Sequence, residues 1–530
     1  MNTTAEVILS QCCLIPDISH LRRKHNCDST LSLLICLSFI PYSSIPSFAI
    51  PLLSPSSPLT ALFSLPPYSQ TSRFSTMTKT NKPLHIVVIG GSYGGVACVN
   101  KLLRNLPKES NVAITLIESR DAMYHCIASY RALVQKDFIK NLWIPYTNLF
   151  LESSPHKVVR GTVEKVFFDH VLLSASEPMS SASDITLADE RAAEGSDPHR
   201  VDFDYLVIAT GSTNPSPSKW RVNNSADGIK LMEKAQEDVR QSERIVVVGG
   251  GACGVELASE IKYAFPSKSI TLIHSESALV DYPKFPQSFK DEALRYLEKE
   301  GVEVILNELA EIPGLSKENS IQRAERTIKL KGSGKTFQSD LQFFSIGLSV
   351  DTGLLSTLRP PPESKADGKN KSDKPFDFEK MLNPQTKAIK VKPTLQLEHD
   401  AFPHIFAIGD VSTADPVPTC MAAVAAGETC ARNLVKLVHK EEKRIARRRS
   451  GDEEPENDEA DGYLCRSWNK LEDYVPIRQQ MVLAMNPMGG VCHLPVVGTW
   501  FGGIAAWLVK SGDLFSGRFW RSLNMSKPTS

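Results

Sequence analysis

The sequence predicts an α/β fold with two similar βαβ units and a small C-terminal segment. Two glycine-rich turns are the first observation: residues 90–95 read GGSYGG and residues 249–254 read GGGACG, 159 positions apart. Each turn follows a short apolar run and opens into small residues, which is the order of strand, turn and helix. The chain of 530 residues with 42% apolar content is also long enough for two or three domains.

The first turn follows residues 85–89 (HIVVI), an apolar run typical of a strand buried on both faces. In a G-x-G-x-x-G turn the three glycines permit a tight turn, a close approach of backbone to a pyrophosphate, and close packing of helix on strand. Gly90 and Gly95 occupy the outer positions, whereas Ser92 occupies the middle one. The match to a dinucleotide-binding turn is therefore imperfect at Ser92.

The residues after this turn strengthen that interpretation. We expect a helix over residues 96–106, whose N-terminal amides would favour a diphosphate. A strand over residues 112–117 then ends in Glu118, placed to accept hydrogen bonds from ribose hydroxyls. A turn without ligand is the alternative for an isolated motif, but strand, turn, helix, strand and acid in register favour a dinucleotide.

The second unit matches the pattern at every position. Residues 244–248 (RIVVV) form the strand, and Gly249, Gly251 and Gly254 occupy the three glycine positions before a helix over 255–265. The sequence therefore predicts a second dinucleotide.

The second strand of that unit, over residues 269–273, ends in His274, where a nicotinamide site often has an acid. An acid there would repel the 2′-phosphate of NADP, and a histidine does not. The choice between NADH and NADPH stays open.

Two further strands connect these units. Residues 205–208 lead into the turn Ala209-Thr210-Gly211, and residues 405–408 lead into Gly409-Asp410 before a helix over 419–437. An aspartate at the carboxyl end of a parallel strand lies where ligands bind in open α/β sheets. We expect Asp410 to bind a ribityl or ribose hydroxyl.

Composition excludes several classes of function. Lysine plus arginine equals aspartate plus glutamate, at 60 each, so the net charge indicates no nucleic-acid partner. The eleven cysteines include no C-x-x-C pair, which argues against a zinc ribbon and a thioredoxin-type centre. We expect a reducing compartment.

The first 80 residues differ from the rest of the chain. The basic residues 22–24 precede an apolar run over 31–40, as in a signal or anchor segment. That run is half the ~20 residues that a spanning helix requires. An acid-poor, serine-rich segment also suits a mitochondrial presequence, and disorder or an upstream extension before Met77 is an equal alternative.

The order of these motifs resembles the flavoproteins with two dinucleotide-binding domains, and most of all the apoptosis-inducing-factor-like and ferroptosis suppressor group. Four stretches carry the resemblance: residues 128–134 (ASYRALV), 244–261 (RIVVVGGGACGVELASEI), 271–275 (TLIHS) and 508–520 (LVKSGDLFSGRFW). It implies FAD in the first site, NAD(P)H in the second, and an FAD domain split around the NAD(P)H domain.

The resemblance implies the following plan. An N-terminal extension over 1–80 precedes the first part of the FAD domain over 81–225, the NAD(P)H domain over 226–336, the second FAD part over 337–437 with an insertion at about 360–380, a charged linker over 438–465 and a C-terminal segment over 466–530. Charged or serine-rich stretches at 174–200, 360–380 and 440–461 read as surface insertions.

The resemblance also implies individual contacts. A guanidinium at Arg131 would suit a phosphate because it donates in a fork, and a salt bridge is the alternative. Val163 follows Gly161 on a strand of the FAD domain. The implied cofactor-binding residues are Gly90, Gly91, Ser92, Tyr93, Gly94, Gly95, Glu118, Arg131, Val163, Thr210, Gly211 and Asp410 for FAD, and Gly249, Gly251, Gly254 and His274 for NAD(P)H.

Glu256 and Glu260 are one turn apart on the expected helix and share a face. The corresponding glutamate of type II NADH dehydrogenases lies near flavin and nicotinamide, so we expect Glu256 to be a proton-relay or supporting residue. The alternative is that the helix dipole alone favours a carboxylate there.

The chain lacks the C-x-x-x-x-C pair of the disulfide reductases, and an isolated Cys126 reads as packing more readily than as a peroxidatic thiol. The resemblance therefore implies an NAD(P)H:quinone oxidoreductase, with hydride passing to flavin and electrons to a ubiquinone-like acceptor. The alternatives are a flavin-linked reductase of a protein electron carrier, thiol or peroxide, and a cell-death-related redox factor.

Aromatic and basic residues alternate in the C-terminal segment, at Trp500, Phe501, Trp507, Lys510, Phe515, Arg518, Phe519, Trp520 and Arg521. They suit a peripheral contact with lipid and equally a packing face between domains. We expect a cytoplasmic protein and leave open an association with mitochondria or membrane. A myristoylation signal is absent after Met1 and after Met77, and the sequence does not indicate the oligomeric state.

Overall fold

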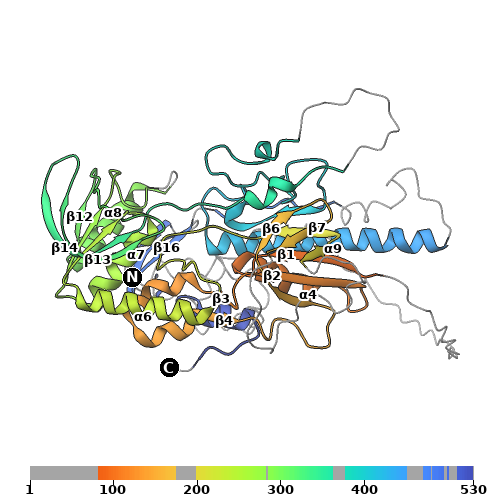
Figure 1. Cartoon of the computed structure of the whole chain (residues 1–530), viewed down its shortest axis with the longest axis horizontal. Helices are drawn as coiled ribbons and strands as arrows, with labels where there is room; N and C mark the ends of the chain where they lie inside the picture. Colours follow the sequence, from red (N-terminus) through yellow and green to blue (C-terminus); the bar gives the residue numbers. More distant parts are fainter. Residues whose placement is uncertain are drawn as a thin grey trace, which may run out of the picture. The chain divides into compact units, whose positions relative to one another are not determined.

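Two five-stranded sheets form the centre of the part of the chain that the structure describes (Figure 1). This computed structural model describes residues 82–174, 199–281, 285–361, 376–450, 470–478, 480–494, 498–500, 506 and 510–528. The predicted extension over 1–80 and residues 175–198, 362–375 and 451–461 of the expected insertions lie outside these residues. The described residues from Leu84 onward belong to one compact unit.

The first sheet has the strand order β15-β9-β1-β2-β5 and is parallel throughout. The chain leaves this sheet after β9 and returns to it at β15, where Ile405 pairs with Leu206. Its strands are β1 (Leu84–Ile89), β2 (Val112–Glu118), β5 (Lys157–Arg160), β9 (Tyr205–Ile208) and β15 (Ile405–Ala407).

Alternate residues of β1 face two different cores. Ile86 and Val88 pack with α4 (Tyr93–Asn105) and α9 (Cys420–Ser450), the long light-blue helix of Figure 1. Val87 and Ile89 pack with a second core that includes Val166 and Val201. These belong to a three-stranded sheet of β6 (Val163–Val166), β7 (His170–Leu173) and β8 (Arg200–Asp202).

The second sheet has the order β12-β11-β10-β14-β13, with only the pair β13 and β14 antiparallel. Its strands are β10 (Arg244–Val248), β11 (Ser269–Ile273), β12 (Glu303–Ile305), β13 (Ile321–Lys329) and β14 (Thr336–Phe344). Ile245 and Val247 pack with α6 (Ser225–Gln241), α7 (Ala252–Ala264) and α8 (Gln287–Glu300), while Val246 and Val248 pack with Ile328.

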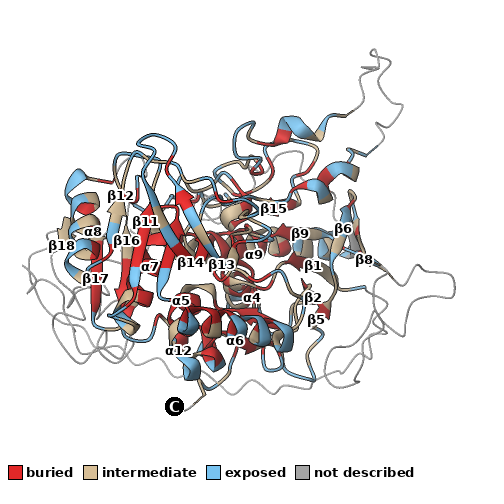
Figure 2. Ribbon diagram, turned by 60° about the vertical axis from the view of Figure 1, so that its left-hand side comes forward, coloured by how far each residue is buried: buried red, intermediate tan, exposed pale blue. Residues whose placement is uncertain are grey.

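The C-terminal segment packs on the helices of both five-stranded sheets. Its antiparallel sheet of β16 (Met481–Asn486), β17 (Gly489–Leu494) and β18 (Gly498–Trp500) shares a core with α7, through Leu483 and Val491. Its last helix, α12 (Ser516–Ser522), shares a core with α4 through Phe519 and Trp520. Buried residues concentrate in the strands and on the inner helix faces (Figure 2).

Short elements complete the described chain. They are β3 (Ala122–Tyr124), paired with β4 (Trp143–Pro145), the α-helix α5 (Ser129–Val134), and the 3₁₀ helices η2 (Cys126–Ala128), η3 (Lys136–Asn141), η4 (Gly353–Thr357), η5 (Phe378–Met381) and η6 (Gly409–Val411).

The predicted α/β fold with two dinucleotide-type units is confirmed, although several expected ends move. The helix expected from residue 96 begins at Tyr93, and the helix expected to end at residue 437 continues to Ser450. The first part of the expected charged linker, including Arg444, is therefore helical. The domain boundaries themselves stay predictions.

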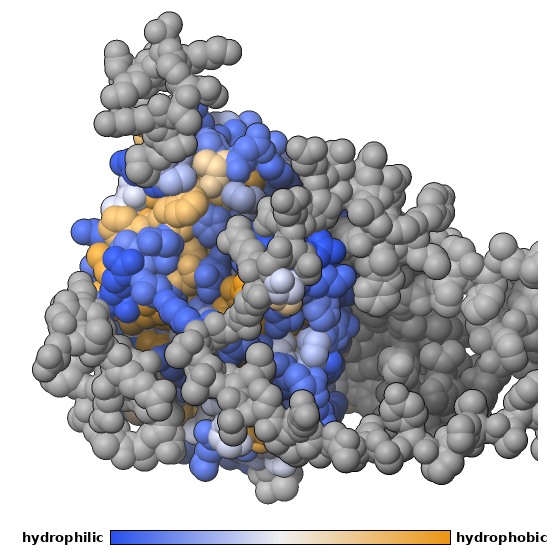
Figure 3. Space-filling view, turned by 90° about the vertical axis from the view of Figure 1, so that its right-hand side faces the viewer, coloured by the Kyte–Doolittle hydropathy of each residue, from blue (hydrophilic) through white to orange (hydrophobic). Residues whose placement is uncertain are grey.

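Among the described residues no helix combines the length and apolarity needed to cross a membrane. On the face drawn in Figure 3, apolar areas lie among hydrophilic ones.

Candidate functional site

The first glycine turn has a shape that only glycine permits at two positions. Gly90 has φ +103°, and a Cβ there would lie 2.4 Å from the carbonyl oxygen of Ala209. A Cβ on Gly95 would lie 1.9 Å from the carbonyl oxygen of Gly90. In these contacts the backbone of β1, α4 and the end of β9 comes together without intervening side chains. The backbone itself therefore forms the concave turn in which a diphosphate could lie.

Ser92, the imperfect position of the motif, is the N-cap of α4 with φ −96°. A side chain is tolerated there because this φ lies in the ordinary region for L-residues. The helix has neither a side-chain cap nor an acidic residue in its first turn. Its N-terminal amides and positive dipole end are thus available to a diphosphate.

Tyr93 and Gly94 begin α4 and are buried. A Cβ on Gly94 would lie 3.2 Å from the carbonyl oxygen of Ala423, and one on Gly427 would lie 2.3 Å from the carbonyl oxygen of Gly94. Glycine at these two positions lets α9 pack directly on the beginning of α4.

Glu118 ends β2 beside the turn, where the sequence predicts it. Its Oε2 accepts a hydrogen bond from the Gly91 amide at 2.7 Å, and its side chain is 7% exposed. Tyr146 closes the other side of Gly91, because its hydroxyl donates to the Gly91 carbonyl at 2.5 Å. A carboxylate at this edge suits ribose hydroxyls.

Asp410 lies at the end of β15, and its Oδ2 accepts a hydrogen bond from Ser212 Oγ at 2.6 Å. Lys219 Nζ lies 3.9 Å from the same carboxylate and donates to the Ser212 carbonyl at 2.7 Å. Thr210 is exposed, and Gly211 has φ +69° with open space around its Cβ position. The ends of β9 and β15 are thus joined beside Asp410.

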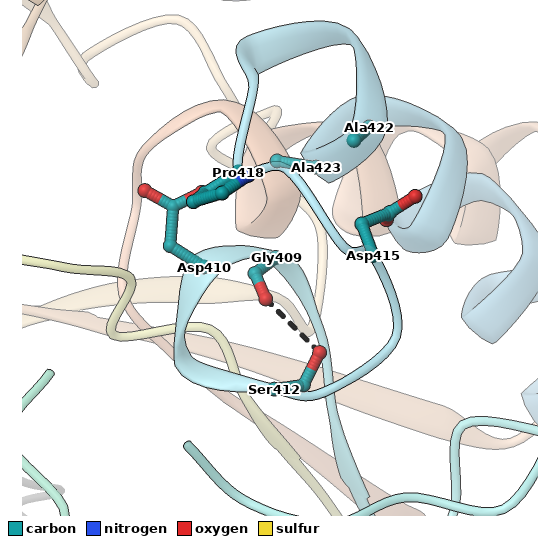
Figure 4. Close-up of a pocket in the computed structure, with 7 residues that line it drawn as sticks. All are labelled: Gly409, Asp410, Ser412, Asp415, Pro418, Ala422 and Ala423. Atoms are coloured by element: carbon teal, nitrogen blue, oxygen red, sulfur yellow. Dashed lines mark hydrogen bonds between the residues drawn. The ribbon is translucent and has the colours of Figure 1, made fainter. Parts of the chain in front are cut away.

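Asp410 lines a small, partly open pocket at the beginning of α9 (Figure 4). The Ser412 hydroxyl donates to the Gly409 carbonyl at 2.9 Å and shapes its floor, and Asp415 lies across Pro418 from Asp410 in this view. Burial raises the pKa of Asp415, whose carboxylate accepts from Tyr474 at 2.7 Å. A second small pocket shares Asp415 and is also lined by Phe285.

The second glycine turn repeats the first. Gly249 has φ +119°, and a Cβ on Gly254 would lie 1.8 Å from the Gly249 carbonyl oxygen. Gly251, the N-cap of α7, has φ −70°, and α7 has no side-chain cap and no acid in its first turn. The His274 ring lies over Gly250, where a Cβ would meet it at 2.7 Å. Burial lowers the pKa of His274 and the charges of Glu276 and Asp281 oppose that fall, so the ring is neutral at pH 7.

Glu256 lies on α7, two residues beyond the glycine turn, and is 9% exposed. Its Oε1 accepts from Lys510 Nζ at 2.6 Å and from the Ala484 amide at 2.8 Å. Burial raises the pKa of Cys420, the first residue of α9, and the charges of Arg518 and Lys510 oppose that rise. Lys510 therefore binds a helix that lies 254 residues away in the sequence, a contact that residue spacing does not indicate.

Arg131 has a different environment from the one the resemblance implies. Its guanidinium pairs with Glu260 at 2.7 Å and donates to the Ser511 carbonyl at 3.1 Å, and its side chain is 2% exposed. The structure therefore favours the salt-bridge alternative over the phosphate contact. Val163 begins β6, outside the first sheet, and packs against the core that includes Val87.

A buried chain of hydrogen bonds links the first turn to the C-terminal segment. His125 Nε2 lies 2.8 Å from the Leu514 carbonyl, which can only accept, so Nε2 carries the proton. Its Nδ1 then accepts from the Tyr93 hydroxyl at 3.0 Å. The Tyr93 oxygen lies 3.5 Å from Cys126 Sγ. Sequence reasoning missed His125, whose only local signal is its place after a short apolar strand.

The aromatic residues of the C-terminal segment divide into two groups. Phe519 and Trp520 are 4% and 5% exposed, and Phe519 lies against Tyr93 and His125. They form a packing face, as one of the two alternatives predicts. Phe501 and Trp507 lie outside the described residues, as does the side chain of Trp500.

Comparison with known proteins agrees with this geometry. A family model described as pyridine nucleotide-disulphide oxidoreductase matches residues 84–429. Human ferroptosis suppressor protein 1 is 27% identical over 451 residues, covering 84% of this chain and 97% of that protein. Apoptosis-inducing factor homolog B of Dictyostelium discoideum is 25% identical over 463 residues, covering 85% and 99%. The resemblance found in the sequence is confirmed.

Among solved structures, the sulfide:quinone oxidoreductase of the hyperthermophilic bacterium Aquifex aeolicus aligns with a TM-score of 0.47 at 18% identity. The alignment covers 67% of this chain and 77% of that one.

Proposed function

The chain belongs to the pyridine nucleotide-disulphide oxidoreductase family, and from this premise we propose that it passes electrons from NAD(P)H to a quinone. It is an oxidoreductase with FAD and NAD(P)H as cofactors. The observation that supports a quinone best is the lack of a C-x-x-x-x-C pair in a chain similar to ferroptosis suppressor protein 1. Electrons that reach the flavin then need an acceptor from outside the chain.

Two of the described cysteines also argue against a thiol redox centre within the chain. Burial raises the pKa of Cys253 and Cys420, which keeps both as thiols at neutral pH. The thiolate is the reactive form, so these residues are poor redox centres.

We assign the first glycine turn to FAD. Gly90 and Gly95 form the cradle that a Cβ would fill, and the uncapped N-terminus of α4 binds the diphosphate. Glu118 binds the adenosine ribose, and Asp410, oriented by Ser212, binds a ribityl hydroxyl.

The second turn then binds NAD(P)H, with the uncapped N-terminus of α7 for its diphosphate. Neutral His274 neither repels nor pairs with a 2′-phosphate, so we propose that both nicotinamides are accepted.

When bound, FAD accepts hydride and passes electrons onward, which is chemistry that the cofactor itself supplies. The chain contributes position and charge. Lys510 Nζ, held by Glu256, places an ammonium against α7, two residues beyond the second glycine turn. A quinone gains two protons on reduction, and we assign Lys510 as the residue that holds a proton for the acceptor oxygen, with Glu256 as its supporting carboxylate.

Stopped-flow absorbance tests the proposal on the FAD-loaded protein. NADH should bleach the flavin, and a short-chain quinone should restore its colour. Failure to bleach would sink the proposal as a whole. Bleaching without recovery would leave the oxidoreductase and remove the quinone.

Gly251→Leu separates the two cofactor sites, because φ −70° tolerates a side chain that would then obstruct the diphosphate. We expect FAD to stay bound and reduction by NADH to be lost. Gly353→Leu is the matched control and should change neither, because Gly353 is exposed and a Cβ there would meet only the Asp351 side chain, at 3.3 Å. Loss of FAD from Gly251→Leu would contradict the assignment of the two turns.

Two expectations from the sequence stay predictions. They are a peripheral membrane contact through the C-terminal aromatic residues and an association with mitochondria. Binding of a protein or DNA partner that survives Gly251→Leu would favour the cell-death factor instead.

A further inference from the structure

Two carboxylates of α7, one turn apart, hold two adjacent residues of the C-terminal segment, Lys510 and Ser511. Glu256 Oε1 accepts from Lys510 Nζ at 2.6 Å. Glu260 accepts from Arg131 Nε at 2.8 and 2.9 Å, and Arg131 Nη1 donates to the Ser511 carbonyl at 3.1 Å. One carboxylate thus binds the Lys510 side chain, and the other binds, through Arg131, the backbone of the next residue.

The Arg131–Glu260 pair is costly to bury. Both side chains are 2% exposed, and two ions removed from water seldom stabilise a fold more than apolar residues of the same size. Burial raises the pKa of Glu260 to about 7, and Arg131 opposes that rise. General stability therefore explains this pair poorly, and a role in orienting a neighbour explains it better.

The guanidinium is well suited to such a role because it is planar and donates in fixed directions. One edge faces Glu260 on α7, and Nη1 faces the Ser511 carbonyl. Arg131 itself lies on α5, whose residues Tyr130 and Ala132 are buried in the core shared with α7. The Ser511 carbonyl is thus held against two packed helices.

Further contacts hold the same segment at its other side. Lys510 Nζ donates to the Val482 carbonyl at 3.1 Å, and Ser511 Oγ donates to the Gly489 carbonyl at 3.0 Å. These contacts come from β16 and β17 of the C-terminal sheet. Only Arg131 ties the Lys510–Ser511 backbone to α5 and α7 among the described contacts of Ser511.

We propose that Arg131 and Glu260 are positioning residues, which fix the Ser511 carbonyl and thereby keep Lys510 Nζ against Glu256. The pair acts through Lys510 and makes no contact with the glycine turns among the described hydrogen bonds. The proposal rests on the proposed function only where it connects Lys510 with turnover.

Arg131→Lys is the sharpest test. A lysine keeps a positive charge for Glu260, but its single ammonium lacks the fork that also reaches the Ser511 carbonyl. Lys510 should then leave Glu256 more often. We expect its labelling by an amine-reactive reagent, followed residue by residue by mass spectrometry, to rise about tenfold.

Lys268 serves as the internal control. It is 5% exposed, and its Nζ donates to the Arg240 carbonyl at 3.0 Å and makes no described contact with Arg131 or Glu260. Its labelling should stay slow. Arg244→Lys, at the exposed pair with Asp340, is the matched substitution and should leave Lys510 protected.

Glu260→Asp provides a second variant if Arg131→Lys folds poorly. The shorter carboxylate draws the guanidinium away from Ser511, so Lys510 labelling should rise there too, by a smaller factor. An unchanged Lys510, or an equal rise at Lys268, would overturn the positioning role.

Turnover distinguishes this inference from the proposed function. In NADH-to-quinone assays Arg131→Lys should lower kcat and leave KM for NADH unchanged, because the nicotinamide turn is not altered. Selective labelling with unchanged kcat would keep the positioning role and remove Lys510 from turnover. If the unmodified protein shows no turnover, the proposed function fails and the labelling still decides the inference.

Discussion

Stability of this protein should fall at mildly acidic pH because of one buried histidine. His125 is fully buried, with Nε2 donating to the Leu514 carbonyl at 2.8 Å and Nδ1 accepting from Tyr93 at 3.0 Å. Burial lowers its pKa to about 4 against the opposing effects of the Leu514 carbonyl and the Asp513 charge, while the charges of Lys510 and Lys527 lower the pKa further. The neutral ring is therefore the form that the fold accommodates.

The sign follows from comparing the two states. The unfolded chain binds a proton at His125 near pH 6.5, whereas the folded chain does so only near pH 4. Protons therefore favour the unfolded chain between these values. The contribution of the neutral His125 ring to the free energy of unfolding is complete above pH 6.5 and is lost as pH falls through the pKa of about 4. The full shift corresponds to about 3 kcal/mol, of which about 2 kcal/mol is lost between pH 8 and pH 5.

His125→Gln removes the titration and keeps an amide that can donate to the Leu514 carbonyl. The assay is urea unfolding of both proteins at pH 8 and pH 5. The loss of unfolding free energy on acidification should be about 2 kcal/mol smaller in the variant. His439→Gln, at a side chain 45% exposed, is the control. Equal acid sensitivity of His125→Gln and the unmodified protein would refute the reasoning.

Three other outcomes follow from the site. Gly95→Ala should yield protein without FAD absorbance, because its Cβ would lie 1.9 Å from the Gly90 carbonyl oxygen. Glu118→Ala should weaken FAD binding about tenfold in a fluorescence titration, since the Gly91 amide loses a charge-assisted hydrogen bond of 2.7 Å. Burial raises the pKa of Cys253, so iodoacetamide at pH 8 should modify it far more slowly in the folded than in the urea-unfolded protein.

The strands and turns were accessible from the sequence because their signals are local. The strands at 205–208, 244–248 and 269–273 are observed with the predicted ends. Apolar runs and glycine positions suffice for this, since a tight turn with φ above zero selects glycine within a few residues. The helix end expected at residue 437 is wrong: a block of charge is typical of a linker, but arginine and glutamate also favour helices, and α9 continues to Ser450.

The imperfect glycine motif shows how a local rule can fail without consequence. Ser92 departs from the pattern, yet its φ of −96° needs no glycine. The strict positions are Gly90 and Gly95, where backbone carbonyls leave no space for a Cβ. Counting glycines against a pattern therefore says less than asking which of them the turn requires.

Partners of buried charges were not accessible, for a different physical reason. Arg131 and Glu260 are 129 residues apart, and Glu256 and Lys510 are 254 apart. Spacing predicts that the two glutamates share a helix face but not which cations meet them. A buried carboxylate must be paired, since leaving it alone costs several kcal/mol. Two adjacent carboxylates on a buried helix face therefore demand two cations from elsewhere in the chain. A buried Glu260 and a bound phosphate therefore compete for the same guanidinium. In the structure Arg131 pairs with Glu260.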